Sequence, residues 1–283
     1  MTSALPSRTE TWAFEAGEFA VHIYGGGPPL LLVHGIGPGT SIRANFSAVL
    51  PALAAQRTVY GIDLIGFGAS PRKQAPPLFD FDLWVKQARA AVSRIGATEL
   101  AVWGQSLGAA VALSVAAEEP SVTTVIGTGA GGGAQELNET LDRFWASPAT
   151  PEAMRRAMEG AVYAPGLLSD AQIEDRFGRL SAEGLGPYFD AMMASGKQAH
   201  LQSCWLSPDV LQRVRARVLL IHGRDDRPVP YRESALHLLD HLQDARLMLL
   251  SRCGHNPMLE RTDDVLALAL AHLPTRQATP CNT

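Results

Sequence analysis

A serine near the middle of the chain stands where a nucleophile is expected. Ser106 is the centre of Gly104-Gln105-Ser106-Leu107-Gly108, which lies between an apolar run and an alanine-rich run. A serine on such a strand-to-helix turn holds its Oγ clear of the backbone, and the flanking glycines let strand and helix pack closely. The segment therefore predicts a nucleophile elbow. The alternative is a serine that only caps the helix.

A serine hydroxyl is a weak nucleophile unless a neighbouring base takes its proton. With this kind of elbow, an acid and then a histidine follow the serine along the chain, each of them after a strand. Asp225 and Asp226 follow an apolar strand over residues 217–222, and His255 follows the last apolar strand. We therefore expect His255 as general base and one of the two aspartates as its orienting acid. The alternative for His255 is a turn histidine that caps the final helix.

The tetrahedral intermediate of such a reaction carries an oxyanion that needs preorganised N–H donors. One donor usually follows the nucleophile, and the other belongs to the loop after an early strand. Leu107 and Ile36 occupy these places, and we expect His34, at the start of the glycine-rich loop 34–39, to order that loop by hydrogen bonding. A phosphate-binding loop is the other interpretation, but the sequence lacks the Gly-Lys-Ser/Thr ending and the dinucleotide spacing.

The elements that must position these residues alternate between strands and helices. Apolar runs predict strands at 19–24, 30–34, 58–63, 122–128, 217–222 and 246–250, besides the one before the elbow. Helical signals cover 45–56, 82–95, 231–239 and 262–273, besides the helix after the elbow. This order predicts an α/β fold with a mostly parallel, doubly wound sheet, and the carboxyl ends of its strands bring the three loops to one site.

The pattern changes after a Gly-rich segment, 129–133, which is either a hinge or a tight crossing. Residues 131–208 show helical periodicity without a clear strand and predict an inserted helical cap, so that 1–130 and 209–283 form the core domain. The cap holds methionines and aromatic residues that either line an apolar pocket or pack the cap onto the sheet. They are Met154, Met158, Met192, Met193, Phe144, Trp145, Tyr163, Phe177, Tyr188, Phe189 and Trp205.

Composition limits the partners. The 283 residues carry a formal charge of −4, which offers no basic field for nucleic acid or an anionic membrane. No stretch has the pattern of a signal peptide or a membrane span. Three scattered cysteines predict neither a disulfide framework nor a zinc site, and reduced thiols fit a cytoplasmic protein. We expect a small-molecule substrate, no metal and no cofactor; a homo-oligomer is left open. The remaining histidines show no catalytic pattern: His22, His200, His222, His237, His241 and His272.

The chain resembles the α/β-hydrolase superfamily over nearly its whole length, and within it the meta-cleavage-product hydrolases. These enzymes break a C–C bond in 2-hydroxy-6-oxo-hexa-2,4-dienoates formed during the degradation of aromatic compounds. The stretches that carry the resemblance are His34-Gly-Ile-Gly-Pro-Gly39 with Asn45-Phe46, Asp63-Leu-Ile-Gly-Phe-Gly-Ala-Ser70, His222-Gly-Arg-Asp-Asp-Arg227 with Val229-Pro230, and Asp244-Ala-Arg-Leu247 before Cys253-Gly-His255. The resemblance implies an α/β-hydrolase fold with a cap and a serine hydrolase that needs no cofactor.

The resemblance also implies roles for individual residues. It makes Ser106 the nucleophile, His255 the base and later the acid, and selects Asp226 as the orienting acid. It makes the N–H groups of Ile36 and Leu107 the oxyanion donors.

Two substrate contacts follow from the resemblance. Asn45 matches an asparagine of the family, and Arg176 matches a cap arginine that holds the dienoate carboxylate. A guanidinium suits a planar carboxylate. The alternative for Arg176 is a surface residue paired with Glu174 or Asp175.

Three positions depart from the family pattern and border the expected pocket. Gln105 replaces an asparagine before the nucleophile, Asn256 replaces a tryptophan after the histidine, and Arg43 stands where a tryptophan is frequent. Exchanging indoles for polar groups changes the shape and polarity of a pocket. We therefore expect Gln105 and Asn256 to contact the substrate, and either its acyl side or the whole substrate to differ from those of typical members. A carboxylesterase or lactonase is the alternative activity, and a non-catalytic ligand receptor on the same fold is a further alternative.

Overall fold

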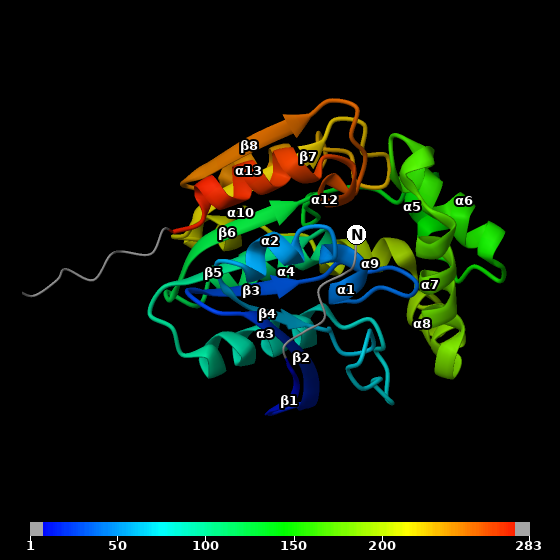
Figure 1. Ribbon diagram of the computed structural model, residues 1–283, viewed down its shortest axis with the longest axis horizontal. Coiled ribbons are helices and arrows are strands. Elements are labelled where there is room, and N and C mark those ends of the chain that lie inside the picture. Colours follow the sequence, from blue (N-terminus) through cyan, green and yellow to red (C-terminus); the bar gives the residue numbers. More distant parts are fainter. Residues whose placement is uncertain (1–7, 275–283) are drawn as a thin grey trace, which may run out of the picture.

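The computed structural model describes residues 8–274, and its centre is an eight-stranded sheet in the order β1-β2-β4-β3-β5-β6-β7-β8 (Figure 1). From β3 onward every neighbouring pair is parallel, whereas β2 pairs antiparallel with both β1 and β4. This confirms the predicted α/β class and the mostly parallel sheet. The strands are β1 (Arg8–Phe14), β2 (Gly17–Gly25), β3 (Pro29–Val33), β4 (Thr58–Ile62), β5 (Leu100–Gln105), β6 (Val122–Thr128), β7 (Arg217–Gly223) and β8 (Ala245–Leu250).

Two local predictions from the sequence were wrong or incomplete. The strand β1 was not predicted, because it is an edge strand whose mixed sequence, RTETWAF, buries only Trp12. The single helix expected over 45–56 is two short helices, α1 (Ile42–Phe46) and α2 (Leu50–Ala54). Pro51 explains the break, because a proline inside a helix lacks the N–H and clashes with the carbonyl four residues earlier.

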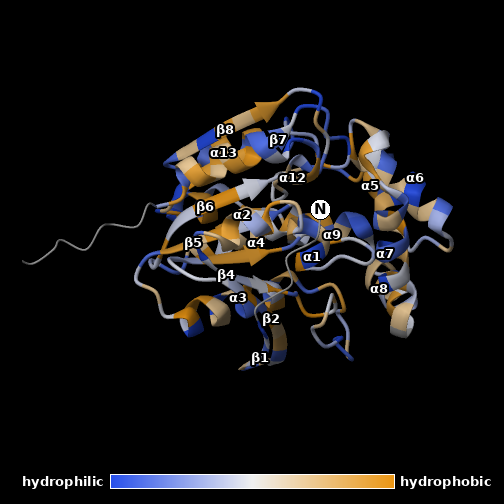
Figure 2. Ribbon diagram, in the orientation of Figure 1, coloured by the Kyte–Doolittle hydropathy of each residue, from blue (hydrophilic) through white to orange (hydrophobic). Residues whose placement is uncertain are grey.

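Helices cover both faces of the sheet and form two apolar cores with it. One core holds apolar residues of α3 (Phe81–Ile95), α4 (Leu107–Ala116), α10 (Pro208–Arg213) and α11 (Ala235–His241). The other holds residues of α1, α2, α12 (Pro257–Glu260) and α13 (Thr262–His272). Figure 2 shows the hydrophobic colour concentrated in the central strands. Because the strands are covered on both faces, they are apolar throughout rather than alternating.

Between β6 and β7 the chain forms a group of helices. These helices lie beyond the carboxyl ends of β6 and β8 (Figure 1). Within the described part of the chain, residues 131–208 contain no strand. These helices share a small core of their own that includes Met154, Ile173 and Leu180. They are α5 (Glu139–Phe144), α6 (Pro151–Ala161), η1 (Pro165–Leu167), α7 (Asp170–Ser181), η2 (Ala182–Gly184), α8 (Leu185–Met193) and α9 (Lys197–Ser203), and we refer to 131–208 as the cap.

The Gly-rich segment before the cap packs closely against the core. A Cβ on Gly133 would lie 2.3 Å from the carbonyl oxygen of Glu233, and one on Gly129 would lie 2.8 Å from that of His255. Gly129 also has a φ of 51°. Of the two interpretations drawn from the sequence, this geometry favours the tight crossing.

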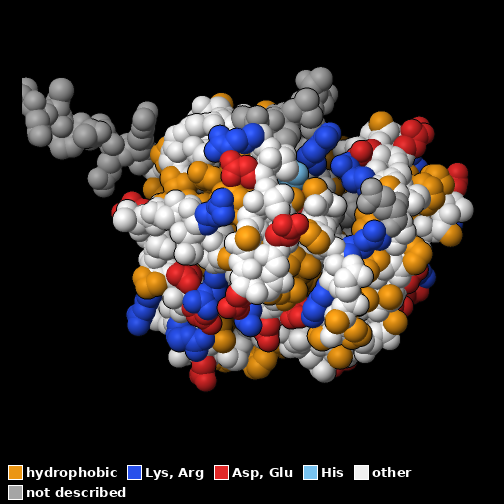
Figure 3. Space-filling view, turned by 90° about the horizontal axis from the view of Figure 1, so that it is seen from below, with side chains coloured by type: hydrophobic (Ala, Val, Ile, Leu, Met, Phe, Trp, Pro, Cys, Tyr) orange, Lys and Arg blue, Asp and Glu red, His pale blue; other side chains and the backbone are white. Residues whose placement is uncertain are grey.

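The surface carries charges of both signs. Figure 3 shows Lys and Arg side chains interspersed with Asp and Glu on the face in view. No helix among residues 8–274 is long and apolar enough to cross a membrane. Cys204 and Cys253 are buried free thiols, and the third cysteine, Cys281, lies outside the described residues.

Candidate active site

Ser106 occupies a strained turn between β5 and α4. Its backbone has a positive φ of 55° with ψ −123°, and its side chain makes no capping hydrogen bond to α4. A Cβ on Gly104 would lie 2.2 Å from the carbonyl oxygen of Gly108, and one on Gly108 would lie 2.3 Å from that of Val33. Both positions therefore require glycine. The elbow geometry predicted from the sequence is present, and the helix-cap interpretation is wrong.

Three side chains from distant parts of the chain form one hydrogen-bonded line. The Nε2 atom of His255 lies 3.0 Å from Oγ of Ser106, and its Nδ1 lies 2.8 Å from Oδ2 of Asp226. Because a carboxylate only accepts hydrogen bonds, Nδ1 carries the proton and Nε2 is left to accept from the serine hydroxyl. His255 and Asp226 are buried. The arrangement can therefore transfer the serine proton to a histidine that an acid orients.

The carboxylate of Asp226 is held charged by its neighbours. Burial alone raises the pKa of Asp226, but the electrostatic attraction of His255 and the interactions with the ring N–H groups of His222 and His255 outweigh it and hold this pKa below its ordinary value. The backbone N–H of Val229 donates to Oδ1 at 2.8 Å. His222, on β7, lies 3.0 Å from Oδ2 and received no role from the sequence. In the sequence, its spacing of four residues from Asp226 was the only sign that the two side chains meet.

The loop of His255 is fixed by backbone hydrogen bonds to the cap and to α12. The His255 N–H donates to the carbonyl oxygen of Ala161 at 2.7 Å. The carboxylate of Glu260 accepts from the N–H groups of Gly254, at 3.0 Å, and Tyr163, at 2.7 Å. Burial raises the pKa of Glu260, although these bonds act in the opposite direction. Glu260 was not predicted from the sequence as part of the site.

The loop after β3 lies beside the serine and presents a free N–H group. A Cβ on Gly35 would lie 2.9 Å from the Cβ of Ser106. Among the described residues, no acceptor is found for the N–H of Ile36 or of Leu107, the first residue of α4. Two unpaired backbone donors, one on the residue after the serine and one on the loop beside it, are what an oxyanion hole requires.

Two polar side chains hold this loop. The Nδ1–H of His34 donates to the carbonyl oxygen of Gly35 at 2.7 Å, and its Nε2 accepts from the N–H of Leu64 at 2.9 Å. Asn45 accepts from the N–H of Gly35 at 2.8 Å through Oδ1. The structure therefore uses Asn45, expected as a substrate contact, to fix the loop that carries Ile36.

Arg176 is buried against the same loop. Its Nε donates to the carbonyl oxygen of Pro38 at 2.9 Å, one Nη donates to Oγ1 of Thr40 at 3.1 Å, and the guanidinium lies 5.5 Å from the centre of the Phe144 ring. Among the described residues, no carboxylate pairs with it. Burial lowers the pKa of Arg176 to about 10.

This placement excludes one of the two interpretations of Arg176. The surface pairing with Glu174 or Asp175 is wrong, because Asp175 pairs with Arg179 instead. The Phe144 ring, which Arg176 covers, also lies 6.4 Å from the imidazole of His255. A buried guanidinium that has no carboxylate partner among residues 8–274 can hold an anion.

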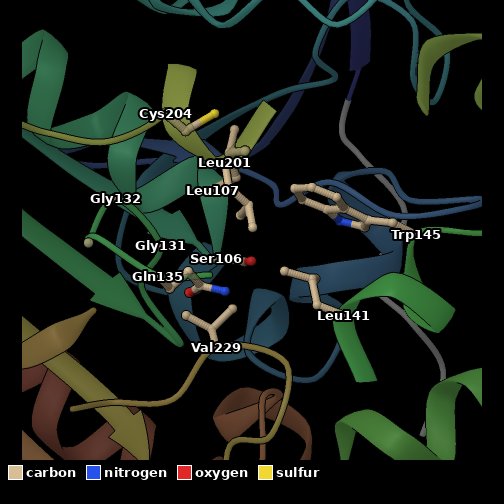
Figure 4. Close-up of a pocket in the computed structure, with 11 residues that line it drawn as sticks. Ser106, Leu107, Gly131, Gly132, Gln135, Leu141, Trp145, Leu201, Cys204 and Val229 are labelled. Carbon is tan, nitrogen blue, oxygen red and sulfur yellow. The ribbon is translucent and has the colours of Figure 1, made fainter. Parts of the chain in front are cut away.

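A mainly apolar pocket opens beside Ser106 on the side of the Gly-rich segment. Figure 4 shows the serine oxygen pointing into the space between Leu107, Leu141, Trp145 and Val229. Of the cap residues with two interpretations, Trp145 thus lines the pocket, whereas Met154 packs in the core of the cap. The lining residues are Ser106, Leu107, Gly131, Gly132, Gly133, Gln135, Leu141, Trp145, Leu201, Cys204 and Val229.

Gln105 and Asn256 lie outside the lining of this pocket, and their expected contact with the substrate stays a prediction. Gln105 is buried behind the histidine, and its Nε2 donates to the carbonyl oxygen of His255 at 2.9 Å. Asn256 begins α12 and its N–H donates to Glu260 at 3.3 Å. Neither side chain lines the pocket. A residue next to a catalytic one in sequence can point away from the pocket, because the backbone turn at each site decides the direction.

A family model and sequence relatives match most of the chain. Residues 30–268 match the model described as the alpha/beta hydrolase family. A 2-hydroxy-6-oxo-2,4-heptadienoate hydrolase of Pseudomonas putida strain F1 is 30% identical over 252 residues, which cover 89% of this chain and 91% of the relative. A 2-hydroxymuconate semialdehyde hydrolase of Pseudomonas sp. strain CF600 is 30% identical over 241 residues, which cover 85% and 84%.

Solved structures also match most of the chain. A mutant of the meta-cleavage product hydrolase CumD superposes with a TM-score of 0.87 at 26% identity and covers 93% of this chain and 97% of its own. The 2-hydroxy-6-oxo-6-phenylhexa-2,4-dienoate hydrolase of Rhodococcus sp. strain RHA1 superposes with a TM-score of 0.83 at 29% identity and covers 94% and 98%. The neighbours and this chain therefore share one architecture, including the part between β6 and β7.

Proposed function

The chain belongs to the alpha/beta hydrolase family, and we propose that it is a serine hydrolase that breaks a C–C bond in a 2-hydroxy-6-oxo-hexa-2,4-dienoate formed during aromatic degradation. The observation that carries this proposal is Arg176, a buried guanidinium with no carboxylate partner among the described residues, which packs on the loop after β3 and on the Phe144 ring next to His255. A simple ester has no use for such a cation, whereas a dienoate carries a carboxylate. The names of the two relatives at 30% identity support the same substrate class.

The proposed orientation of the substrate follows from the two environments around Ser106. The carboxylate binds to Arg176, which lies against the loop after β3. The C6 substituent enters the apolar pocket between Leu141 and Trp145. The C6 carbonyl oxygen then lies against the N–H groups of Ile36 and Leu107.

The first half of the proposed reaction forms an acyl-enzyme. The dienol tautomerises to a ketone, which makes C5 able to leave with the electron pair of the C5–C6 bond. His255 takes the proton of Ser106, and Oγ attacks C6 to give an oxyanion stabilised by the two backbone donors. The C5–C6 bond then breaks, its electron pair moves through C4 and C3 onto the C2 oxygen, His255 returns its proton to that oxygen, and a 2-hydroxydienoate departs.

The second half releases the acid. His255 takes a proton from a water molecule, and the resulting hydroxide attacks the acyl carbon. The tetrahedral intermediate collapses, the C–Oγ bond breaks, and the proton returns from His255 to Ser106. Asp226 stays ionised throughout and stabilises the imidazolium, which its lowered pKa favours.

The test is a direct comparison of two substrate classes. Purified protein is mixed with 2-hydroxy-6-oxohepta-2,4-dienoate, and the loss of the dienoate absorbance is followed beside the hydrolysis of p-nitrophenyl esters. We expect rapid bleaching, and a loss of at least about 1000-fold in Ser106→Ala. Ester hydrolysis alone would instead identify a carboxylesterase or lactonase. No turnover of either substrate, with ligand-dependent stabilisation that survives in Ser106→Ala, would identify a receptor.

The proposal extends to the place of action. The free thiols of Cys204 and Cys253 are compatible with a reducing compartment, and we propose the cytoplasm. Localisation of a tagged chain in fractionated cells tests this statement.

A further inference from the structure

A second histidine lies behind the catalytic acid, on the side away from Ser106. His222, near the end of β7, is fully buried. Its Nε2 lies 3.0 Å from Oδ2 of Asp226 and 2.8 Å from the carbonyl oxygen of Val229. The same Oδ2 is 2.8 Å from Nδ1 of His255. One carboxylate oxygen thus stands between two imidazoles.

The neighbours of His222 define its tautomer. The carbonyl oxygen of Val229 can only accept, so Nε2 carries a proton. The other ring nitrogen, Nδ1, is buried and has no hydrogen-bond partner among the described residues. A second proton there would be a buried donor without an acceptor, which is costly. His222 is therefore a neutral ring whose only N–H points between Asp226 and Val229.

We propose that His222 is a positioning residue for the reaction, which holds the Asp226 carboxylate in the orientation that His255 requires and shares its negative charge. The inference rests on the proposed function, because it gives His255 the role of base. Oδ2 of Asp226 accepts from Nδ1 of His255 and lies 3.0 Å from Nε2 of His222, whose N–H it shares with the Val229 carbonyl, and Oδ1 accepts from the Val229 N–H. Rotation of the carboxylate would disturb all three contacts, so together they fix its plane.

Removal of the His222 donor would have a specific electrostatic effect. A carboxylate that has lost a hydrogen bond keeps more charge on Oδ2 and attracts the imidazolium of His255 more strongly. His255 would then act as a base only at higher pH. Glu260 and Cys253 also interact electrostatically with Asp226, and neither changes in this comparison.

The matched variants are His222→Gln, which keeps an N–H donor near the position of Nε2, and His222→Leu, which has none. The readout is the rate at which a fluorophosphonate labels Ser106, measured against pH, because this reaction needs His255 and Asp226 but no dienoate. If the protein does not cleave the proposed dienoate, this test of His222 therefore still applies. His237→Leu is the control, since His237 also bonds a backbone carbonyl through Nε2 but lies away from Asp226.

For His222→Leu we expect labelling at neutral pH to slow by about 10-fold or more, the effect of losing one hydrogen bond to a charged group. The acid limb of the pH profile should move to higher pH by about half a unit. His222→Gln should restore most of the labelling rate and most of the original position of the acid limb. The control variant, His237→Leu, should change neither quantity. An unchanged acid limb in a folded His222→Leu would overturn the proposal.

A second measurement uses the unmodified protein, in case His222→Leu does not fold. In ¹⁵N-histidine spectra, His222 should show the neutral Nε2–H form throughout the pH range in which labelling of Ser106 rises. A charged ring, or a proton on Nδ1, would overturn the proposal.

Discussion

The N–H of His255 donates a 2.7 Å hydrogen bond to the carbonyl oxygen of Ala161, the last residue of α6 in the cap. A Cβ on the preceding Gly254 would lie 2.7 Å from the same oxygen, so the two backbones are in direct contact. The loop that carries the catalytic base therefore rests on the cap. A displacement of α6 would move His255 relative to Ser106, and a misplacement of about 1 Å can cost on the order of 100-fold in rate.

The first prediction concerns Glu260, which joins the same two backbones. Its carboxylate accepts from the N–H groups of Tyr163, Gly254 and Asn256. Glu260→Ala should lower the free energy of unfolding by about 1–3 kcal/mol, because these donors lose their acceptor. We also expect kcat to fall by about 10-fold as the His255 loop loosens. Urea unfolding and steady-state kinetics measure the two effects.

Glu99→Ala is the control for Glu260→Ala, because Glu99 is exposed. It should change neither quantity. If Glu260→Ala lost stability but kept the kcat of the unmodified protein, the link between Glu260 and the His255 loop would be contradicted.

The second prediction concerns Asn45, whose Oδ1 accepts from the N–H of Gly35 at 2.8 Å. Asn45→Ala should reduce kcat by about 10-fold, since the neighbouring Ile36 N–H would no longer be held in place for the oxyanion. Asn45→Asp keeps an acceptor at this position and should retain more activity than Asn45→Ala. Equal losses in both variants would indicate that Asn45 acts through its Nδ2 on the substrate instead.

The third prediction separates the carboxylate contact from the rest of the reaction. Arg176→Gln should raise KM for the dienoate by about 10- to 100-fold, the effect of a charge-assisted hydrogen bond of about 1.5–3 kcal/mol. Hydrolysis of p-nitrophenyl acetate, which has no carboxylate, should change by less than about 3-fold. Arg179→Gln is the matched control, because Arg179 pairs with Asp175. Equal losses on both substrates would contradict the anion-binding role.

The fourth prediction is a pH dependence of stability that comes from His34. Burial lowers the pKa of His34 below its ordinary value of 6.5, and its Nε2 accepts from the Leu64 N–H only while it is unprotonated. A lowered pKa in the folded state means that the stabilisation is complete above pH 6.5 and is lost as the pH falls toward the folded value. The free energy of unfolding should therefore decrease below pH 6.5, by at most about 1.4 kcal/mol per pH unit from this group.

Urea unfolding at several pH values measures the dependence attributed to His34. In His34→Gln the protein should be less stable at neutral pH, and the slope between pH 6.5 and pH 5 should be smaller. An unchanged slope would assign the dependence to other groups, such as His200, whose pKa is also lowered by burial.

Much of the fold was predictable because it depends on local patterns. Strand β6 lies where the apolar run predicted it, and α3 and α13 begin or end within one residue of their predicted limits. The turn at Ser106 was predictable for the same reason, because the close contacts of Gly104 and Gly108 exclude a side chain at those positions. Edge strand β1 escaped prediction because an exposed strand does not need an apolar run.

The sequence by itself determined the order of serine, acid and histidine, and the strands that bring them to one edge of the sheet. Only the tertiary structure decided where the neighbouring side chains point. It turned Gln105 behind His255, placed His222 against Asp226 and buried Arg176 away from every carboxylate of residues 8–274. The hydrophobic periodicity and the spacing of motifs predict the path of the backbone. The direction of a side chain depends on partners from distant segments, and a local sequence pattern does not contain those partners.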